Sequence, residues 1–509
     1  MKFSKRYKII FVIALAFMGS CSKDFLDVPP TGRLTSESYL KTNEEVKAAI
    51  VGVYNSMQTN FSNGSWTSEF FVKNLPGDDC LAGSSEGDQP GYQNIDDFAI
   101  QTDNAKILGV WTNIYKSISS ANTIIDKVPG DTPAMKSMVA EAKALRAFNY
   151  LELVIMFGGV PLMTTNPTDE AQYSLPRSTA EEVYAQIEKD LTEAIPDLPL
   201  KSEYSEADRY RMSKGAAQAF LGKAYLYQKK YSDAAAQFAA VISSNEYALE
   251  PNFADVWSKS TEFGQESLFE ISYTSKESYD WGNFPWGGGN ESNIEVQLQG
   301  PRGDLFDLSN SSLNILNGWG FNMPSAKIGK AFEDAHDSIR GAATVMSAAD
   351  FEATGGVIKD PNAHDYGGYM RMKYVTRASQ TSSQGIPELN YTTNWRLMRY
   401  ADVLLMAAEA YHFSDNDAQA LVELNKVRER AKLDDIKASD DIFAAIVKER
   451  QLELAFEGSR FWDLVRWGMA DQELGSLGYK SATNGLFPIP QNEIIANKAM
   501  DKSNQNPGY

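Results

Sequence analysis

The sequence contains few of the residues that build covalent or metal-held folds. Among 509 residues there are two cysteines and three histidines. Two cysteines can form at most one disulfide, which excludes a disulfide-stapled scaffold. The histidines, His336, His364 and His412, are far apart in the sequence and lack metal-ligand spacing such as H-E-x-x-H. Zinc sites and histidine-dependent hydrolase triads therefore have no local support.

Long apolar runs are also missing, although a membrane-spanning helix needs about 20 such residues. The N-terminal apolar run, Ile9 to Met18, has roughly half of that length and follows a basic cluster within residues 2–8. The small residues Gly19 and Ser20 come next. A basic segment, a short apolar segment and small residues before a cleavage point are typical of a secretory signal. Residues 1–20 are therefore predicted to be a signal peptide.

A cysteine stands directly after this signal. The segment ending at Cys21 resembles a bacterial lipobox, although Met18 occupies the position where such boxes usually carry Leu. Ser22, Lys23 and Asp24 resemble the signal that sends lipoproteins of the Bacteroidetes outward to the cell surface. The resemblance implies a lipid on Cys21 that anchors the chain without a membrane span. A plain cleaved secretory signal is the alternative.

Positive charge is scarce. The chain has 48 Lys and Arg against 67 Asp and Glu, and loss of four basic residues with the signal lowers the net charge from −19 to −23. Nucleic-acid binding usually requires a basic patch, so a nucleic-acid partner is not expected. Lipidation of Cys21 would leave Cys80 unpaired, and no disulfide is expected.

No Pro- or Ser-rich linker divides the mature chain, which favours one domain over residues 21–509. Helical patterns dominate both ends. The segment "AEAKALRAFNYLELVIMFGG" is closed by Gly158 and Gly159, and a helix with a capping residue at Ser178 or Thr179 follows. Apolar residues also recur at three- and four-residue steps near the N-terminus. These are Val46, Ile50, Val53, Met57, Ile107, Val110, Trp111, Ile114 and Ile118.

Two segments have the plan of a helical hairpin. Leu221, Gly222 and Tyr225 match the L-G-x2-Y step of a tetratricopeptide repeat, and Ala234 with Phe238 matches its A-x3-F step. The segment "ADVLLMAAEAYHFSDNDAQALVELNKVRERA" has the same order of an Ala-rich helix, a polar turn and a second helix. The pattern predicts a mainly all-α fold with a tetratricopeptide-like helical-repeat scaffold.

The amino-acid composition changes over residues 245–390, where Gly, Asn, Ser and aromatic residues replace Ala and Leu, as in "YDWGNFPWGGGNESN". Helical periodicity is lost, which predicts a loop-rich, partly irregular insert. Short strands are expected at "SLFEISYT" and "RMKYVT". Loops on a rigid scaffold often carry binding sites, so this insert is the expected ligand face.

The C-terminal third carries a pattern with a family resemblance. The segments "NWRLMRYADVLLMAAEA", "LNKVRERA", "IVKERQLELAFEGSRFWDLVRWG", "FPIPQNEIIAN" and "NQNPGY" resemble the SusD/RagB family of surface nutrient-binding lipoproteins. "AEAKALRAFNYLELVIMFGGVPL" and "KGAAQAFLGKAYLY" stand in the family's order upstream. The resemblance implies an α-helical capture protein on the outer membrane, facing the exterior. Its implied partners are a SusC-like TonB-dependent transporter and a glycan or other nutrient, and no catalysis is implied.

Glycan binding requires exposed aromatic faces for the apolar side of a sugar ring and planar polar groups for its hydroxyls. The variable loops supply both kinds, although each ring has a role in the core as its alternative. For Trp111, Trp462 and Trp467, which lie on helical patterns, the core role is favoured. The glycan-binding candidates are Trp281, Trp286, Trp319, Tyr279, Asn283, Trp66 and Tyr92.

Acidic residues leave other chemistries open. Asp78, Asp79, Asp96 and Asp97 occur in predicted turns and offer oxygen ligands for Ca²⁺, but no EF-hand spacing is present and capping or solvated turns are favoured. No cofactor is therefore expected. The acids and arginines of residues 449–466 interleave at helical steps and are interpreted as structural ion pairs.

Three alternatives to glycan capture stay open. A pair of carboxylates could make a surface glycoside hydrolase. A helical-repeat scaffold could be an adaptor that binds a protein or peptide. The captured nutrient could also be a peptide or another molecule that is not a glycan.

Overall fold

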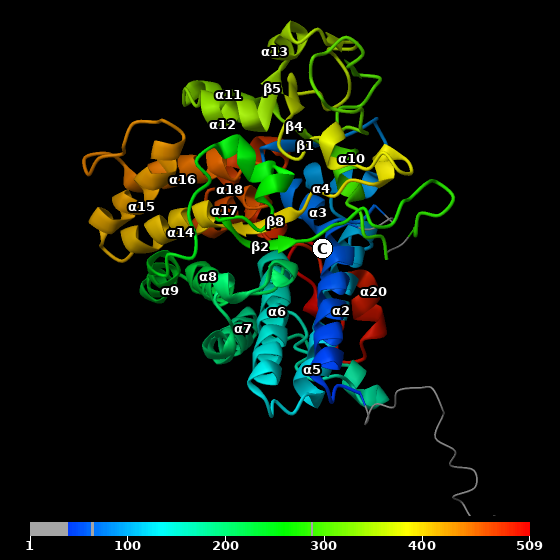
Figure 1. Ribbon diagram of the computed structural model, residues 1–509, viewed down its shortest axis with the longest axis vertical. Coiled ribbons are helices and arrows are strands. Elements are labelled where there is room, and N and C mark those ends of the chain that lie inside the picture. Colours follow the sequence, from blue (N-terminus) through cyan, green and yellow to red (C-terminus); the bar gives the residue numbers. More distant parts are fainter. Residues whose placement is uncertain (1–38, 63–65, 287–288) are drawn as a thin grey trace, which may run out of the picture.

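The computed structural model describes residues 39–62, 66–286 and 289–509. The predicted signal peptide and Cys21 lie outside these ranges. Within them, helices carry most of the regular backbone, and each sheet has two strands (Figure 1). The prediction of a mainly all-α fold is confirmed. The division of the whole chain into a signal and one domain stays a prediction.

Long helices from the first half of the chain pack side by side in the lower part of Figure 1. The four helices are α2 (Asn43–Phe61), α5 (Ala105–Lys127), α6 (Pro133–Phe157) and α7 (Ala180–Ala194). Two of these helices begin at a capping box. Thr42 and Glu45 form it at the start of α2, and Thr179 and Glu182 form it at the start of α7. Gly158 ends the longest helix with a φ of 71°, as its position in the sequence predicted.

The predicted hairpins are present as α8 with α9 and α14 with α15, and α9 also packs on α14. Gly222 explains the close approach of the first pair. A Cβ at this position would lie 2.6 Å from the ring of Phe238, which is fully buried. The bounds are α8 (Lys214–Tyr227), α9 (Tyr231–Ser243), α14 (Tyr400–His412) and α15 (Asp417–Arg430).

The insert of residues 245–390 has more regular structure than its sequence predicted. It contains four helices of six to nine residues, which are too short to show a helical period clearly. Part of it encloses a small second hydrophobic core around Phe306, Phe351 and Met370. The helices are α10 (Ile294–Gln299), α11 (Ala326–Asp334), α12 (Ser338–Thr344) and α13 (Ala348–Ala353).

Over the described residues, four antiparallel strand pairs tie this insert to itself and to one strand on either side of it in the sequence. The strand expected at "SLFEISYT" is confirmed as β2. The strand expected at "RMKYVT" is displaced, because β7 ends at Arg371. The pairs are β1 (Cys80–Gly83) with β4 (Phe321–Pro324), β2 (Ser267–Ile271) with β8 (Trp395–Arg399), β3 (Phe306–Asp307) with β6 (Val357–Ile358), and β5 (Val345–Ser347) with β7 (Tyr369–Arg371).

Shorter helices complete the fold around this framework. Within the described ranges, each helix is too short or too polar to cross a membrane. These shorter helices are α3 (Glu69–Asn74), α4 (Pro90–Asp96), α16 (Ile442–Glu453), α17 (Arg460–Trp467), α18 (Ala470–Leu474), α19 (Ser481–Asn484) and α20 (Gln491–Ala496).

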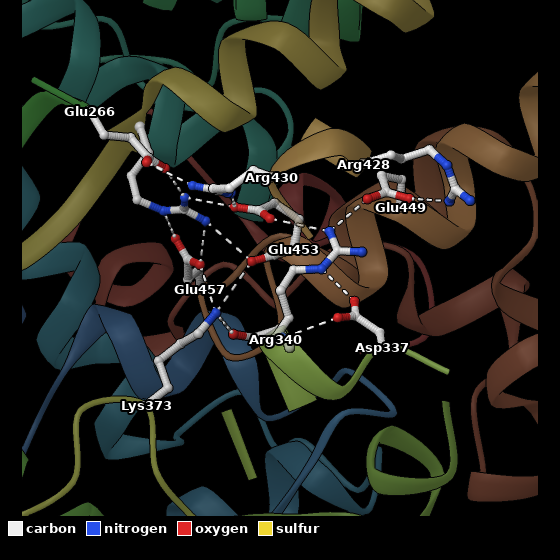
Figure 2. A network of polar contacts seen from close by, with 11 residues as sticks. Glu266, Asp337, Arg340, Lys373, Arg428, Arg430, Glu449, Glu453 and Glu457 are labelled. Carbon is white, nitrogen blue, oxygen red and sulfur yellow. Dashed lines mark hydrogen bonds and ion pairs between the residues drawn. The ribbon is translucent and has the colours of Figure 1, made fainter. Parts of the chain in front are cut away.

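Buried ion pairs hold the C-terminal helices to distant segments (Figure 2). Glu453 contacts the guanidinium groups of Arg340, Arg399 and Arg430. Burial acts to raise the pKa of Glu453, but these three cations outweigh it and hold the pKa well below its usual range. The structural role predicted for these acids is confirmed. Their partners come mainly from other elements, however, and not from neighbouring turns of one helix.

Candidate functional site

Four of the predicted aromatic residues meet in one cluster, here called the tryptophan platform: Trp66, Trp281, Trp286 and Trp319. The ring centroids of Trp281 lie 6.0 Å from those of Trp286 and 6.3 Å from those of Trp319, with interplanar angles of 14° and 26°. Trp66 lies 5.2 Å from both Trp286 and Trp319. Segments more than 200 positions apart in the sequence are thereby brought together.

Two of these rings face solvent to an unusual degree. Trp281 is 48% exposed and Trp286 is 46% exposed, whereas Trp111 and Trp462 are buried, as their helical patterns predicted. Trp467 is half-buried, and its indole N–H donates to Glu409. Large aromatic side chains that stay open on a protein surface commonly mark binding sites. The platform therefore offers apolar faces to a ligand.

The loop that carries Trp281 and Trp286 is shaped by its own polar groups. Asp280 Oδ1 accepts hydrogen bonds from the N–H groups of Gly282 and Asn283 over 2.7 and 3.1 Å. In return, Asn283 Oδ1 accepts from the Asp280 N–H and its amide donates to the Ser278 carbonyl. Asn283 is exposed, but its side chain is engaged in forming this turn. Both ends of the Asn283 side chain are used in the turn that carries the two tryptophans.

Tyr279 and Phe284 anchor the same loop from below. Both are buried, and their rings meet edge to face with centroids 5.3 Å apart. The Tyr279 hydroxyl accepts a hydrogen bond from the Glu291 N–H over 3.1 Å. Tyr279 was expected on the open ligand face. The structure places it beneath that face, because its ring fills the space under the loop.

Trp66 is held by two buried donors. Its backbone has a φ of 57°, a left-handed conformation that is uncommon for a bulky residue. The Tyr92 hydroxyl and Lys106 Nζ each donate to its carbonyl oxygen over 2.7 Å. Tyr92, another predicted ligand residue, is fully buried and therefore supports the platform from behind. Lys106 had no signal in the sequence, because a lysine at the start of a helix is usually solvated.

A buried carboxyl group faces this pair of donors. Glu295 on α10 is completely buried, and neither of its oxygens accepts a hydrogen bond from the described residues. Burial raises the pKa of Glu295 to about 8, against the opposing effect of Lys106. Burial also lowers the pKa of Lys106 to about 8, although Glu295 acts in the other direction. Behind Trp66, a buried amine and a buried carboxyl group therefore both have a pKa of about 8.

Two of the four acids predicted to lie in turns have structural partners. Asp78 forms ion pairs with Arg460 and Lys327, and Asp96 accepts from the Ala82 N–H over 2.8 Å. Over the described part of the chain, no group of three or more His, Cys, Asp or Glu side chains is placed to hold a metal ion. Cys80 is buried and free. The expectation that no cofactor is needed stays a prediction.

Comparisons with known proteins give this platform a context. A family model described as "SusD family" matches residues 340–482, and one described as "Starch-binding associating with outer membrane" matches residues 24–226. A solved "Laminarin binding SusD-like protein" is 33% identical, covers 92% of this chain and 99% of its own, and superposes with a TM-score of 0.81. The chain belongs to the SusD family. The resemblance seen in the sequence motifs is therefore confirmed.

Other SusD-like proteins extend this relationship over the whole chain. The "SusD-like protein P2" of Formosa agariphila is 28% identical and covers 99% of this chain and all of its own. A surface glycan-binding protein A from Bacteroides thetaiotaomicron, solved in complex with laminarihexaose, is 25% identical with a TM-score of 0.78. It covers 91% of this chain and 99% of its own. The tetratricopeptide-like scaffold is thus shared along nearly the full length of this SusD-like protein.

Proposed function

We propose that this SusD-like protein captures an extracellular glycan on the tryptophan platform and holds it without cleaving it. The observation that carries the proposal is the pair of half-exposed, nearly parallel rings of Trp281 and Trp286. Indole faces suit the apolar C–H side of a pyranose ring, and polar groups around them can serve the hydroxyls. Because the loop is tied at its turn and its base, little order has to be gained on binding.

The ligand that the surroundings favour is neutral. The described residues of the loop that carries Trp281 hold three carboxylates, Glu277, Asp280 and Glu291, against one amine, Lys276. The chain as a whole is strongly acidic. An anionic polysaccharide would be repelled. One structural relative is a laminarin-binding SusD-like protein and another was solved in complex with laminarihexaose, so a neutral β-1,3-glucan is the first probe.

The proposal includes a place in the cell, which the N-terminal sequence and the family support. A lipid on Cys21 tethers the mature chain to the outer membrane, facing the exterior, and the bound glycan passes to a SusC-like TonB-dependent transporter. The family description that links these proteins to the outer membrane supports this placement. Contact with such a transporter would extend over a large surface.

Affinity electrophoresis of the chain that starts after Cys21 tests the proposal. Gels containing laminarin or other plant, fungal and host glycans are run with the unmodified chain and with Trp281→Ala. Tyr173→Ala is the control, because Tyr173 is 69% exposed and lies outside the platform. An assay for new reducing ends accompanies each glycan.

Retardation by one glycan without new reducing ends, lost in Trp281→Ala and kept in Tyr173→Ala, supports capture. New reducing ends would identify a glycoside hydrolase instead. No retardation by any glycan would contradict glycan capture and favour a peptide or protein ligand.

A further inference from the structure

A second feature of the molecule that could receive a ligand is a groove beside the base of the platform loop. It has a volume of about 440 Å³ and lies between α2, the turn before α8 and the segment that follows β2. Val51 and the ring of Tyr210 give it apolar surface, and Val51 is 45% exposed. Tyr210 is half-buried and meets Tyr54 edge to face, with centroids 5.2 Å apart. The groove thus has a fixed aromatic wall.

Polar groups that the protein leaves unused surround this wall. They are the Asn55 amide, the Tyr210 hydroxyl, the Ser272 hydroxyl, the Lys276 amine and the Glu291 carboxylate. Within the described residues, none of these side-chain groups makes a hydrogen bond or an ion pair. An amide, a carboxylate and hydroxyls beside an aromatic ring form the combination that recognises sugar hydroxyls and a sugar face together.

The groove is connected to the tryptophan platform through one loop. The N–H of Thr274 donates to the Glu291 carbonyl over 2.7 Å, which closes the base of the loop next to the groove. Lys276 lies at this base, and Trp281 lies five residues further along. The backbone between them can span at most about 18 Å. The groove and the platform are therefore close enough for one extended ligand to contact both.

We propose that the groove is a second subsite for the same neutral glycan chain, which binds sugar units beyond those stacked on the tryptophans. The proposal rests on the proposed glycan capture, and it adds that affinity increases with chain length. Tyr210 provides the ring for the distal unit, and Asn55 with Glu291 binds its hydroxyls. Short oligosaccharides occupy the platform alone.

Calorimetry with laminaritriose and laminarihexaose separates the two subsites. The groove variants are Tyr210→Ala and the double substitution Asn55→Ala with Glu291→Gln. Trp281→Ala is the platform variant, and Tyr173→Ala is the exposed-tyrosine control. Each groove variant is expected to weaken laminarihexaose binding about fivefold to tenfold, the effect of losing one ring contact or one to two hydrogen bonds. Laminaritriose binding should change less than about twofold, because it makes none of these contacts.

The remaining outcomes distinguish failure of the groove from failure of the platform. If the groove variants bind both sugars like the unmodified chain while Trp281→Ala binds neither, the second subsite is wrong and the platform stands. Equal loss of both sugars in the groove variants also contradicts a distal subsite. If the unmodified chain binds neither sugar, the β-glucan function is wrong, and the groove proposal is overturned with it.

Discussion

At the scale of single residues, the platform depends on groups that are buried behind it. Trp66 keeps a left-handed backbone because Tyr92 and Lys106 both donate to its carbonyl oxygen. A buried lysine loses hydration, and its hydrogen bond to the carbonyl and its position 4.7 Å from the centre of the Tyr92 ring offset part of that cost. The exposed rings thus depend on the buried hydrogen bonds that hold Trp66.

Replacing Glu295 with Gln should flatten part of the pH dependence of stability. The pKa of Glu295 is raised by burial from 4.5 to about 8 in the folded state. The folded protein therefore holds a proton that the unfolded chain releases, and stability falls as pH rises from about 4.5 to 8. At about 1.36 kcal/mol per pKa unit, this loss of stability, which the Gln variant should not show, is up to about 5 kcal/mol.

Urea denaturation at pH 5, 6, 7 and 8 measures this effect in both proteins. Other buried acids titrate in the same window, so the difference between the two curves isolates Glu295. Parallel curves would show that Glu295 is not held protonated in the fold.

The sequence predicted which residue types would form the platform, but not how they meet. Glycine, asparagine and tryptophan in one segment indicated an open aromatic loop around Trp281. Nothing local linked that loop to Trp66, because the contact depends on how distant helices pack. Tyr92 and Tyr279 share the chemistry of surface ligand residues, and only the fold shows that their rings are buried.

At the scale of elements, periodicity and end signals were reliable where helices are long. The capping box at Thr179 and the stop at Gly158 are where the sequence placed them. The short helices α10 to α13 were missed because each has fewer than three turns. Their formation depends on tertiary packing, because α10 and α11 bury their apolar residues in the main core and α13 buries Phe351 in the small second core.

Two glycine substitutions should have opposite effects on stability. Gly222→Ala places a Cβ 2.6 Å from the buried Phe238 ring, so overpacking is expected to lower the free energy of unfolding by about 1–3 kcal/mol. Gly52→Ala, inside α2, meets no atom within 4 Å and should raise it by about 0.5–1 kcal/mol through helix propensity.

Urea denaturation of both variants measures these changes. Similar effects of the two substitutions would contradict the close contact between α8 and α9.

At the scale of the whole molecule, buried charges join the repeat helices to the loop-rich insert. Arg340 comes from α12 in the insert, Arg399 from β8 and Arg430 from α15, and all three reach Glu453 on α16 (Figure 2). This meeting of four elements could not be read from spacing, because the sequence suggested pairs within one helix. The network therefore holds α12 of the insert against the C-terminal helices.

Glu453→Gln should destabilise the protein by about 3–5 kcal/mol, because it removes the one carboxylate that Arg340, Arg399 and Arg430 share inside the fold. The pKa of Glu453 is held below its usual range, so its contribution is present above the unfolded pKa of about 4.3 and is lost progressively as pH falls from there toward the lower folded pKa. Thermal denaturation at pH 7 and at about pH 3 measures both effects. Asp334→Asn, which breaks the exposed pair with Lys330, is the control and should leave the midpoint unchanged.

The central claim is that the exposed tryptophans hold the glycan. Calorimetry of laminarihexaose binding to the unmodified chain and to the double variant Trp281→Ala, Trp286→Ala tests it most directly. Affinity should fall at least about tenfold, since each stacked ring contributes about 0.5–1.5 kcal/mol beyond its buried area, with an unchanged thermal midpoint. Equal affinity of the two proteins for laminarihexaose would contradict the account.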